Sequence, residues 1–132
     1  MTLYVESSAL LKLYLDEPES DAAAELLSGE RWTSARHTLV EVRRNLARTL
    51  HGEALAVARE RFAVDWERVD VVELDERTCE LAAELAEGTS LRSLGAMHLG
   101  AATSLDVDIP FATFDRRLGA TARSLGWTVL GA

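Results

Sequence analysis

Short runs rich in β-branched and aromatic residues alternate with longer helical segments along the chain, and this alternation constrains the fold more than any other feature. Helical patterns lie between the runs, with apolar residues recurring every three or four positions. Strands that alternate with helices favour a mostly parallel sheet of four to five strands with helices on both faces, an α/β fold. The runs cover residues 3–5, 31–34, 69–74, 109–114 and 127–130.

Size and composition narrow the class of protein further. The 132 residues fit one domain, 1–132, and 48% of them are hydrophobic, which argues against disorder. We expect no membrane span and no signal peptide, because no apolar run is long enough and the N-terminus looks like a strand. The single cysteine, Cys79, excludes an internal disulfide, and we predict that it is a small buried side chain in a reducing cytoplasm.

The charge balance argues against a purely electrostatic nucleic-acid binder. The net charge is −8, whereas such proteins usually carry a basic excess. Lys12 is the one lysine, so 13 of the 14 basic residues are arginines, whose planar side chains suit phosphate groups. Codon bias explains the arginine excess equally well.

Acidic residues follow two of the predicted strands at the point where each strand ends. Glu6 comes directly after the first strand and Asp115 directly after the fourth. Parallel sheets bind ligands beyond the carboxyl ends of their strands, so this placement indicates a site. The alternatives are an exposed acid at position 6 and a helix N-cap at position 115.

Glu41 lies on the predicted helix 38–51, where Arg44, Asn45 and Arg48 share its face. A solvated helix face with a Glu–Arg pair would account for this pattern without any function. The neighbouring motifs favour a functional role instead.

Four segments, taken in chain order, resemble the motifs of PIN-domain nucleases, in particular the VapC toxins of bacterial toxin–antitoxin pairs. The family opens with a strand that ends in Asp-x-Ser-Ala-Leu, carries a second acid on a helix, a third in Leu-x-x-x-Asp-Ala-x-His-Leu-Ala, and a fourth in Thr-x-Asp. The matching segments span nearly the whole chain: Tyr4–Lys12, Leu39–Arg44, Leu91–Leu99 and Ala112–Leu118.

The resemblance implies a PIN-like fold and an endoribonuclease whose carboxylates hold Mg²⁺ or Mn²⁺, which activates the water that attacks the RNA phosphodiester. Mapped onto this chain, the metal-binding and catalytic acids are Glu6, Glu41 and Asp115. Two positions depart from the family pattern: the first acid is glutamate instead of aspartate, and Gly95 stands where the third acid is expected. We therefore predict weakened metal binding and low or absent cleavage.

Further residues are assigned supporting roles by their place in these motifs. Ser8 and Thr113 carry hydroxyls near the same edge and are expected to bind metal-bound waters, with local turn bonding as the alternative. Arg92 and Arg116 are expected to contact RNA phosphates, and an ion pair is the alternative for Arg92. The resemblance makes His98 a structural histidine.

The other two histidines, His37 and His51, look like surface residues.

The resemblance also implies a cytoplasmic homodimer with a VapB-type antitoxin as its partner and with no membrane association. The main alternative is a non-catalytic protein of the same fold that binds antitoxin or RNA without cutting, which Gly95 favours. A phosphatase of doubly wound type is a second alternative, but it usually needs Asp-x-Asp after the first strand. The sequence Glu6-Ser7-Ser8 does not supply that motif. The RNA target cannot be read from the sequence.

Overall fold

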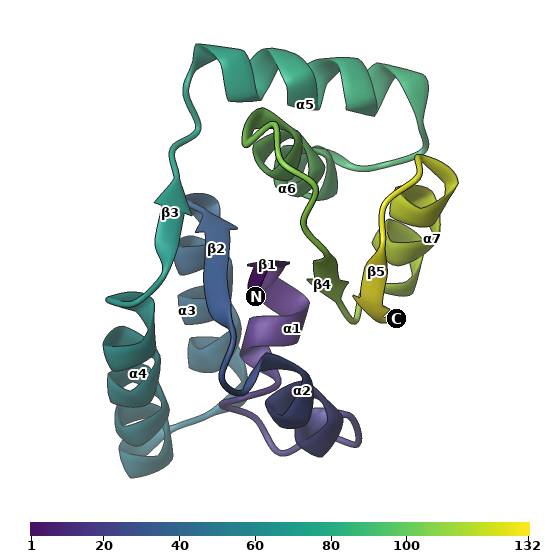
Figure 1. Cartoon of the computed structure of the whole chain (residues 1–132). Coiled ribbons are helices and arrows are strands. Elements are labelled where there is room, and N and C mark those ends of the chain that lie inside the picture. Colours follow the sequence, from purple (N-terminus) through teal and green to yellow (C-terminus); the bar gives the residue numbers. More distant parts are fainter.

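A computed structural model describes residues 1–132, and its five strands form one parallel sheet with the order β3-β2-β1-β4-β5 (Figure 1). The predicted α/β class and parallel sheet are confirmed. The first two strands are each one residue longer than the predicted runs, whereas the third and fourth cover three of six predicted residues and the fifth begins two residues later than predicted. They are β1 (Thr2–Val5), β2 (Arg31–Ala35), β3 (Asp70–Val72), β4 (Phe111–Thr113) and β5 (Val129–Gly131).

Seven helices connect and cover the strands. The first begins at Ser7, because the Glu6 side chain caps it by accepting from the Ser8 backbone N–H. The helix predicted over residues 38–51 is observed over His37–Thr49. The helices are α1 (Ser7–Leu11), α2 (Ser20–Leu27), α3 (His37–Thr49), α4 (Gly52–Trp66), α5 (Glu76–Gly88), α6 (Ser93–Ser104) and α7 (Arg116–Ser124).

The central strand β1 separates two apolar cores because its side chains alternate between the faces of the sheet. Leu3 and Val5 point into a core formed with α1, α2, α3 and α4. Tyr4 points into the opposite core with α6 and α7. Helices therefore cover both faces, as predicted, and each fully buried large side chain contributes about 1.5–3 kcal/mol.

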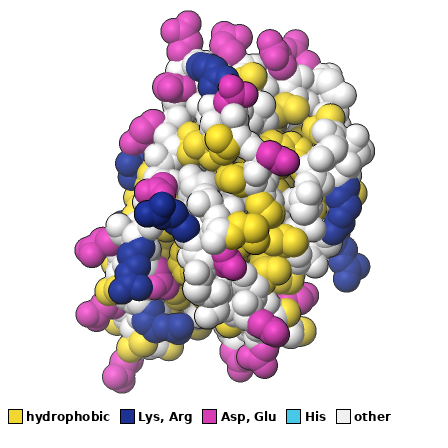
Figure 2. All heavy atoms as spheres, viewed as in Figure 1, with side chains coloured by type: hydrophobic (Ala, Val, Ile, Leu, Met, Phe, Trp, Pro, Cys, Tyr) yellow, Lys and Arg dark blue, Asp and Glu magenta, His cyan; other side chains and the backbone are white.

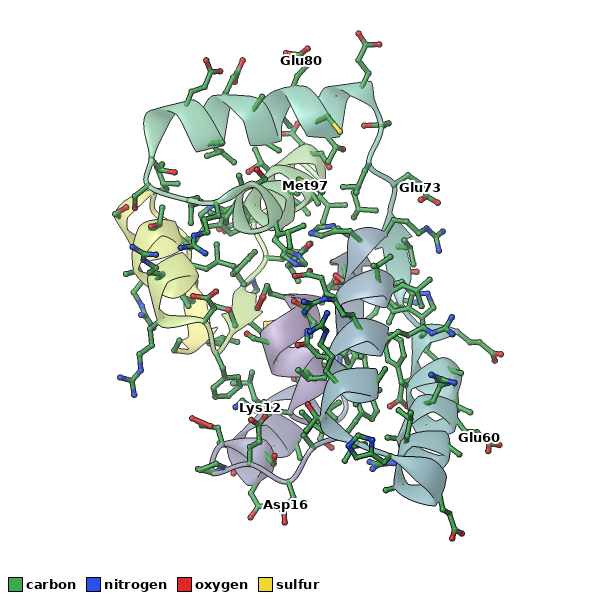
Figure 3. All side chains as sticks on the ribbon, turned by 180° about the vertical axis from the view of Figure 1, so that it is seen from behind. Lys12, Asp16, Glu60, Glu73, Glu80 and Met97 are labelled. Atoms are coloured by element: carbon green, nitrogen blue, oxygen red, sulfur yellow. The ribbon has the colours of Figure 1, made fainter.

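Helix α5 packs closely on α6 and turns its acidic face outward. A Cβ atom at Gly100 of α6 would lie 2.8 Å from the backbone nitrogen of Ala82, so glycine is needed for this close approach. The outer side of α5 carries acidic side chains in Figure 2, and Glu80 points away from the protein in Figure 3. Cys79 also lies on this exposed side, so the prediction that it is buried is wrong; Thr78 and Ala82 hold the inward positions.

The strand order reverses at β1, so the sheet has a topological switch point between the carboxyl ends of β1 and β4. β1 pairs with β2 on one side and with β4 on the other, and the chain moves outward from β1 in both directions. Such a switch point is where parallel sheets bind ligands. Glu6 and Asp115 are the residues that border it. Among the helices, none combines the length and the apolar character that a membrane crossing requires.

Candidate active site at the carboxyl ends of β1 and β4

The Glu6 carboxylate is buried at the switch point and accepts four hydrogen bonds from neighbouring groups. Its side chain caps α1 by accepting from the Ser8 backbone N–H at 3.0 Å. The hydroxyl groups of Ser7, Ser8 and Thr113 also donate to it. Three of the four bonds fall on Oε2, so this oxygen has little capacity left for a cation.

Two short hydrogen-bond chains tie Glu6 to the segment after β4. The Phe114 N–H donates to the Ser8 hydroxyl, and the Asp115 N–H donates to the Thr113 hydroxyl. Both hydroxyls donate onward to Glu6 Oε2. Ser8 and Thr113 therefore lie at the predicted edge, and in this structure they serve the carboxylate directly. Their expected role in holding metal-bound waters stays a prediction.

Glu41, on α3, pairs with histidines and not with the arginines of its own helix face. Its Oε1 lies 2.7 Å from His98 Nε2 and 3.6 Å from His37 Nε2. Asn45, one of its neighbours on that face, donates to the Glu41 main-chain oxygen. The alternative of an ordinary Glu–Arg pair is therefore not what the structure shows.

A buried hydrogen-bond chain holds His98 in place behind Glu41. The Tyr4 hydroxyl lies 2.7 Å from His98 Nδ1 and accepts from the Ala35 backbone N–H at 3.2 Å. Tyr4 and His98 are 0% and 1% exposed, so water cannot replace these partners. His98 is thus a structural histidine, as expected, and it also fixes the position of a site carboxylate.

Burial and the neighbouring His98 act in opposite directions on the pKa of Glu41 and in the same direction on the pKa of His37. Burial alone would raise the pKa of Glu41, but the hydrogen bond from His98 and the neighbouring imidazoles lower the pKa below its usual value. Burial, reinforced by the charge of His98, lowers the pKa of His37 to about 4. Glu41 is therefore ionised and His37 neutral at neutral pH.

The Ser7 hydroxyl donates to Glu6 Oε1 at 3.1 Å, and it also contributes to lowering the pKa of Glu41. Glu6 and the segment before Asp115 belong to one hydrogen-bonded edge, and Ser7 brings Glu41 close to it. Polar atoms gather there in Figure 3, between α6, where Met97 is labelled, and α1, which ends near Lys12.

Asp115 is the most accessible of the three acids. It caps α7 through Oδ1, which accepts from the Leu118 N–H at 3.1 Å, and its other oxygen makes no hydrogen bond. Asp115 borders a hollow of about 90 Å³ together with Gly95, Arg92 and Arg117. Arg92 and Arg116 are exposed and form no ion pair, so both remain free to meet an anion.

Gly95 leaves room where the family pattern has a carboxylate. A Cβ atom there would meet only Leu118 and Leu91 side chains, at 3.6 and 3.7 Å, which is ordinary contact. The position is in the first turn of α6, where an acid is favoured by the helix dipole. Nothing in the packing therefore requires glycine at this position.

The three predicted acids do not form a single compact ligand set. The group whose ligand atoms all lie within 4.8 Å of one another is His37, Glu41 and His98, which contains neither Glu6 nor Asp115. His37 was predicted to be a surface residue, and this is wrong: it is 8% exposed, because the start of α3 packs against the first turn of α6. Its i, i+4 spacing from Glu41 was the signal in the sequence that indicated a pair. His51 is exposed, as predicted.

Comparisons with known proteins show the family to which the chain belongs. The PIN domain profile matches residues 3–124. Two ribonucleases of Mycobacterium tuberculosis, VapC46 and VapC47, are 34% and 35% identical to this chain; the alignments cover 97% and 95% of this chain and 95% and 93% of those proteins.

Solved structures show the same fold at lower sequence identity. The sarcin–ricin loop cleaving toxin VapC20 of Mycobacterium tuberculosis superposes with a TM-score of 0.76 at 16% identity, covering 98% of this chain and 99% of that one. FitAcB from Neisseria gonorrhoeae gives a TM-score of 0.74 at 17% identity, covering 98% and 96%. Fold, motif order and sequence identity over almost the full length lead to one conclusion: the chain belongs to the PIN-domain family, and its relatives there include the VapC ribonucleases.

Proposed function

We propose that this chain is a toxin-type endoribonuclease that cleaves RNA with the help of Mg²⁺ or Mn²⁺ at the β1–β4 switch point. The observation that carries the proposal is the edge itself: Glu6 and Asp115 follow the adjacent parallel strands β1 and β4 at the switch point, and Arg92, which forms no ion pair, borders the same hollow as Asp115. Its relatives named VapC ribonucleases support the reaction class.

The carboxylates fit a hard cation unequally. Asp115 has a free oxygen and is exposed, and Glu41 is ionised with its side chain 20% exposed. Glu6 fits poorly, because its oxygens already accept four hydrogen bonds. When bound, Mg²⁺ or Mn²⁺ would neutralise the phosphate and activate the attacking water. We assign Asp115 and Glu41 as the main ligands and Glu6 as a buried residue that orders the edge.

The remaining residues have roles that need no metal. Arg92 and Arg116 would hold the RNA backbone through charged hydrogen bonds to phosphate oxygens. Ser8 and Thr113 would keep the segment before Asp115 fixed against Glu6, so that the Asp115 carboxylate stays at the switch point.

The same structure supports the prediction that cleavage is weak. Gly95 supplies no carboxylate, and the longer Glu6 side chain folds back onto its own helix. A displacement of about 1 Å in a catalytic group is enough to lower a rate 100-fold. The second candidate function, a non-catalytic protein that binds antitoxin or RNA, is favoured by this same pair of features.

Restoring the family acids tests both candidates. The double variant Glu6→Asp/Gly95→Asp should cleave RNA at least tenfold faster than the present chain in Mg²⁺ or Mn²⁺, since both acids then match the family pattern. Adding Asp115→Asn to the double variant is the control and should remove the gain. Cleavage that is absent in the present chain and equally absent in the double variant would favour the non-catalytic candidate.

The proposal includes partners and a cellular location. Structures similar to this chain contain toxins with their antitoxins, so we propose a VapB-type antitoxin as a partner. We further propose one catalytic domain, residues 1–132, acting as a homodimer in the cytoplasm, where its RNA substrate is found. Size-exclusion chromatography with light scattering would test the dimer.

A further inference from the structure

Two histidines from different helices meet one glutamate beside the proposed nuclease edge. His37 and Glu41 lie one turn apart on α3, and His98 reaches them from α6. One ligand atom from each residue lies within 4.8 Å of the other two. We propose that His37, Glu41 and His98 form a binding site for a divalent ion of borderline softness, such as Zn²⁺. This site shares Glu41 with the proposed nuclease edge, but its two imidazoles take no part in the proposed cleavage.

The distances are close to those of a tetrahedral ion with nitrogen and oxygen ligands. Ligands about 2.0–2.1 Å from Zn²⁺ lie about 3.3 Å from one another at tetrahedral angles. The pair of His37 Nε2 and Glu41 Oε1, at 3.6 Å, would need to shorten by about 0.3 Å. The pair of His98 Nε2 and Glu41 Oε1, at 2.7 Å, would need to open by about 0.6 Å. Side-chain rotations alone can make such changes.

The residue behind His98 matches a requirement of a metal site. A histidine that binds a metal through one nitrogen usually donates its other N–H to a fixed partner. The Tyr4 oxygen, 2.7 Å from His98 Nδ1, is placed to accept that hydrogen. On the other side, His37 Nε2 lies 3.3 Å from the Leu94 carbonyl oxygen, a contact that a bound ion would replace, and His37 Nδ1 is buried with no hydrogen-bond partner.

The ligand types select against the cation proposed for the nuclease edge. Imidazole suits Zn²⁺, Co²⁺ and Ni²⁺, whereas Mg²⁺ strongly prefers oxygen ligands and keeps its waters. Two imidazoles and one carboxylate also leave a fourth position open, as in zinc sites that exchange ligands. The side chains of His37 and His98 are 9% and 1% exposed and that of Glu41 is 20% exposed, so the open position faces Glu41.

The experiment uses tag-free full-length protein stripped of metal by a chelator. Zn²⁺ is titrated calorimetrically, and Co²⁺ is titrated by visible absorption, which reports tetrahedral coordination directly. We expect one ion per chain, and we expect a thousandfold excess of Mg²⁺ not to displace it. Saturation near the stoichiometric point supports the site, whereas the absence of binding up to millimolar Zn²⁺ overturns it.

Matched variants locate the ion. His37→Phe keeps a ring packed against His98, 4.1 Å away, but removes a ligand, so Zn²⁺ affinity should fall at least tenfold. His51→Phe makes the same change at the exposed third histidine and should leave the affinity unchanged. Equal affinity in the two variants would overturn the assignment.

A second substitution covers the case in which His37→Phe does not fold. Glu41→Gln preserves the shape of a partly exposed side chain and should also lower Zn²⁺ affinity at least tenfold, whereas wild-type affinity in this variant would contradict the proposal. Metal binding is read without RNA, so failure of the nuclease proposal and failure of this one are separate results.

Discussion

Removing a single hydroxyl, with Tyr4→Phe, should destabilise the fold and loosen the site together. The Tyr4 oxygen accepts from the Ala35 N–H of β2 and bonds His98 Nδ1 of α6, and all three groups are buried. Phenylalanine fits the same space and keeps the stacking on Phe111, whose ring lies 5.0 Å away. The substitution therefore changes hydrogen bonding with little change in packing.

The magnitude follows from the two partners that the variant leaves without a bond. Each buried polar group that loses its partner costs about 1–3 kcal/mol, so the expected loss for the two groups is about 2–6 kcal/mol. Domains of this kind have about 5–15 kcal/mol of stability in total, so the variant should still fold. Its melting temperature should fall by roughly 3 °C for each kcal/mol lost.

Urea unfolding of Tyr4→Phe beside Tyr14→Phe is the assay. The Tyr14 hydroxyl donates to one group, Asp65, at 2.7 Å, and that carboxylate is reached by water, so its loss should cost about 1 kcal/mol. Tyr4→Phe should lose at least twice as much, and its Zn²⁺ affinity should fall by about tenfold because His98 loses its fixed orientation. Equal losses in the two variants would refute the reasoning, because they would show that the buried chain behind His98 has no special weight.

Three other substitutions or conditions test the packing and the charges. Gly100→Ala should destabilise by about 1–3 kcal/mol in thermal unfolding, because the new methyl would contact the Ala82 backbone at 2.8 Å, whereas Gly88→Ala, with nothing within 4 Å, should not. Metal-free protein should lose stability as the pH falls from 6.5 to about 4, since the unfolded chain binds a proton on His37 that the folded chain does not. Between pH 7 and pH 5 the free energy of unfolding, measured with urea, should fall by about 2 kcal/mol because of His37, and this part of the fall should be absent in His37→Phe. Asp75→Ala removes the cap that accepts from the Thr78 N–H and should cost about 1 kcal/mol by the same assay, with no change in denaturant slope.

The sheet could be predicted from the sequence because local pattern and global topology agree. Every expected strand is part of the sheet. Glu6 follows β1 and Asp115 follows the run that contains β4, so both acids lie at the switch point. Strand ends were less predictable: Val69 and Leu74 have strand-like side chains but lie outside β3, which pairs with β2 over three residues. A short edge strand ends where its pairing with the neighbouring strand ends, and the periodicity of the sequence carries no information about that pairing.

Side-chain partners across the fold were the part that the sequence could not supply. Glu6 was assigned to a metal by its place in a motif, but its four hydrogen-bond donors come from α1 and from Thr113, which is 107 positions away. Cys79 was predicted to be buried because it belongs to an apolar helical pattern. The packing of α5 on α6 instead buries the side of the helix that carries Thr78 and Ala82, and Cys79 is exposed.

The departures from the family pattern change the kind of metal chemistry that this edge favours. An aspartate at position 95 would add a hard oxygen ligand near Asp115, and glycine removes it. Glu6 is then satisfied by hydroxyls and a backbone N–H, while Glu41 is drawn toward His98 and His37. What remains is one accessible carboxylate at Asp115 and a buried group of two imidazoles and one carboxylate. Imidazole favours ions such as Zn²⁺, and hard cations favour a cluster of oxygens. We therefore expect that weak Mg²⁺-dependent cleavage and selective Zn²⁺ binding, if both are measured, have the same structural origin, the absence of a carboxylate at position 95 beside a pair of histidines.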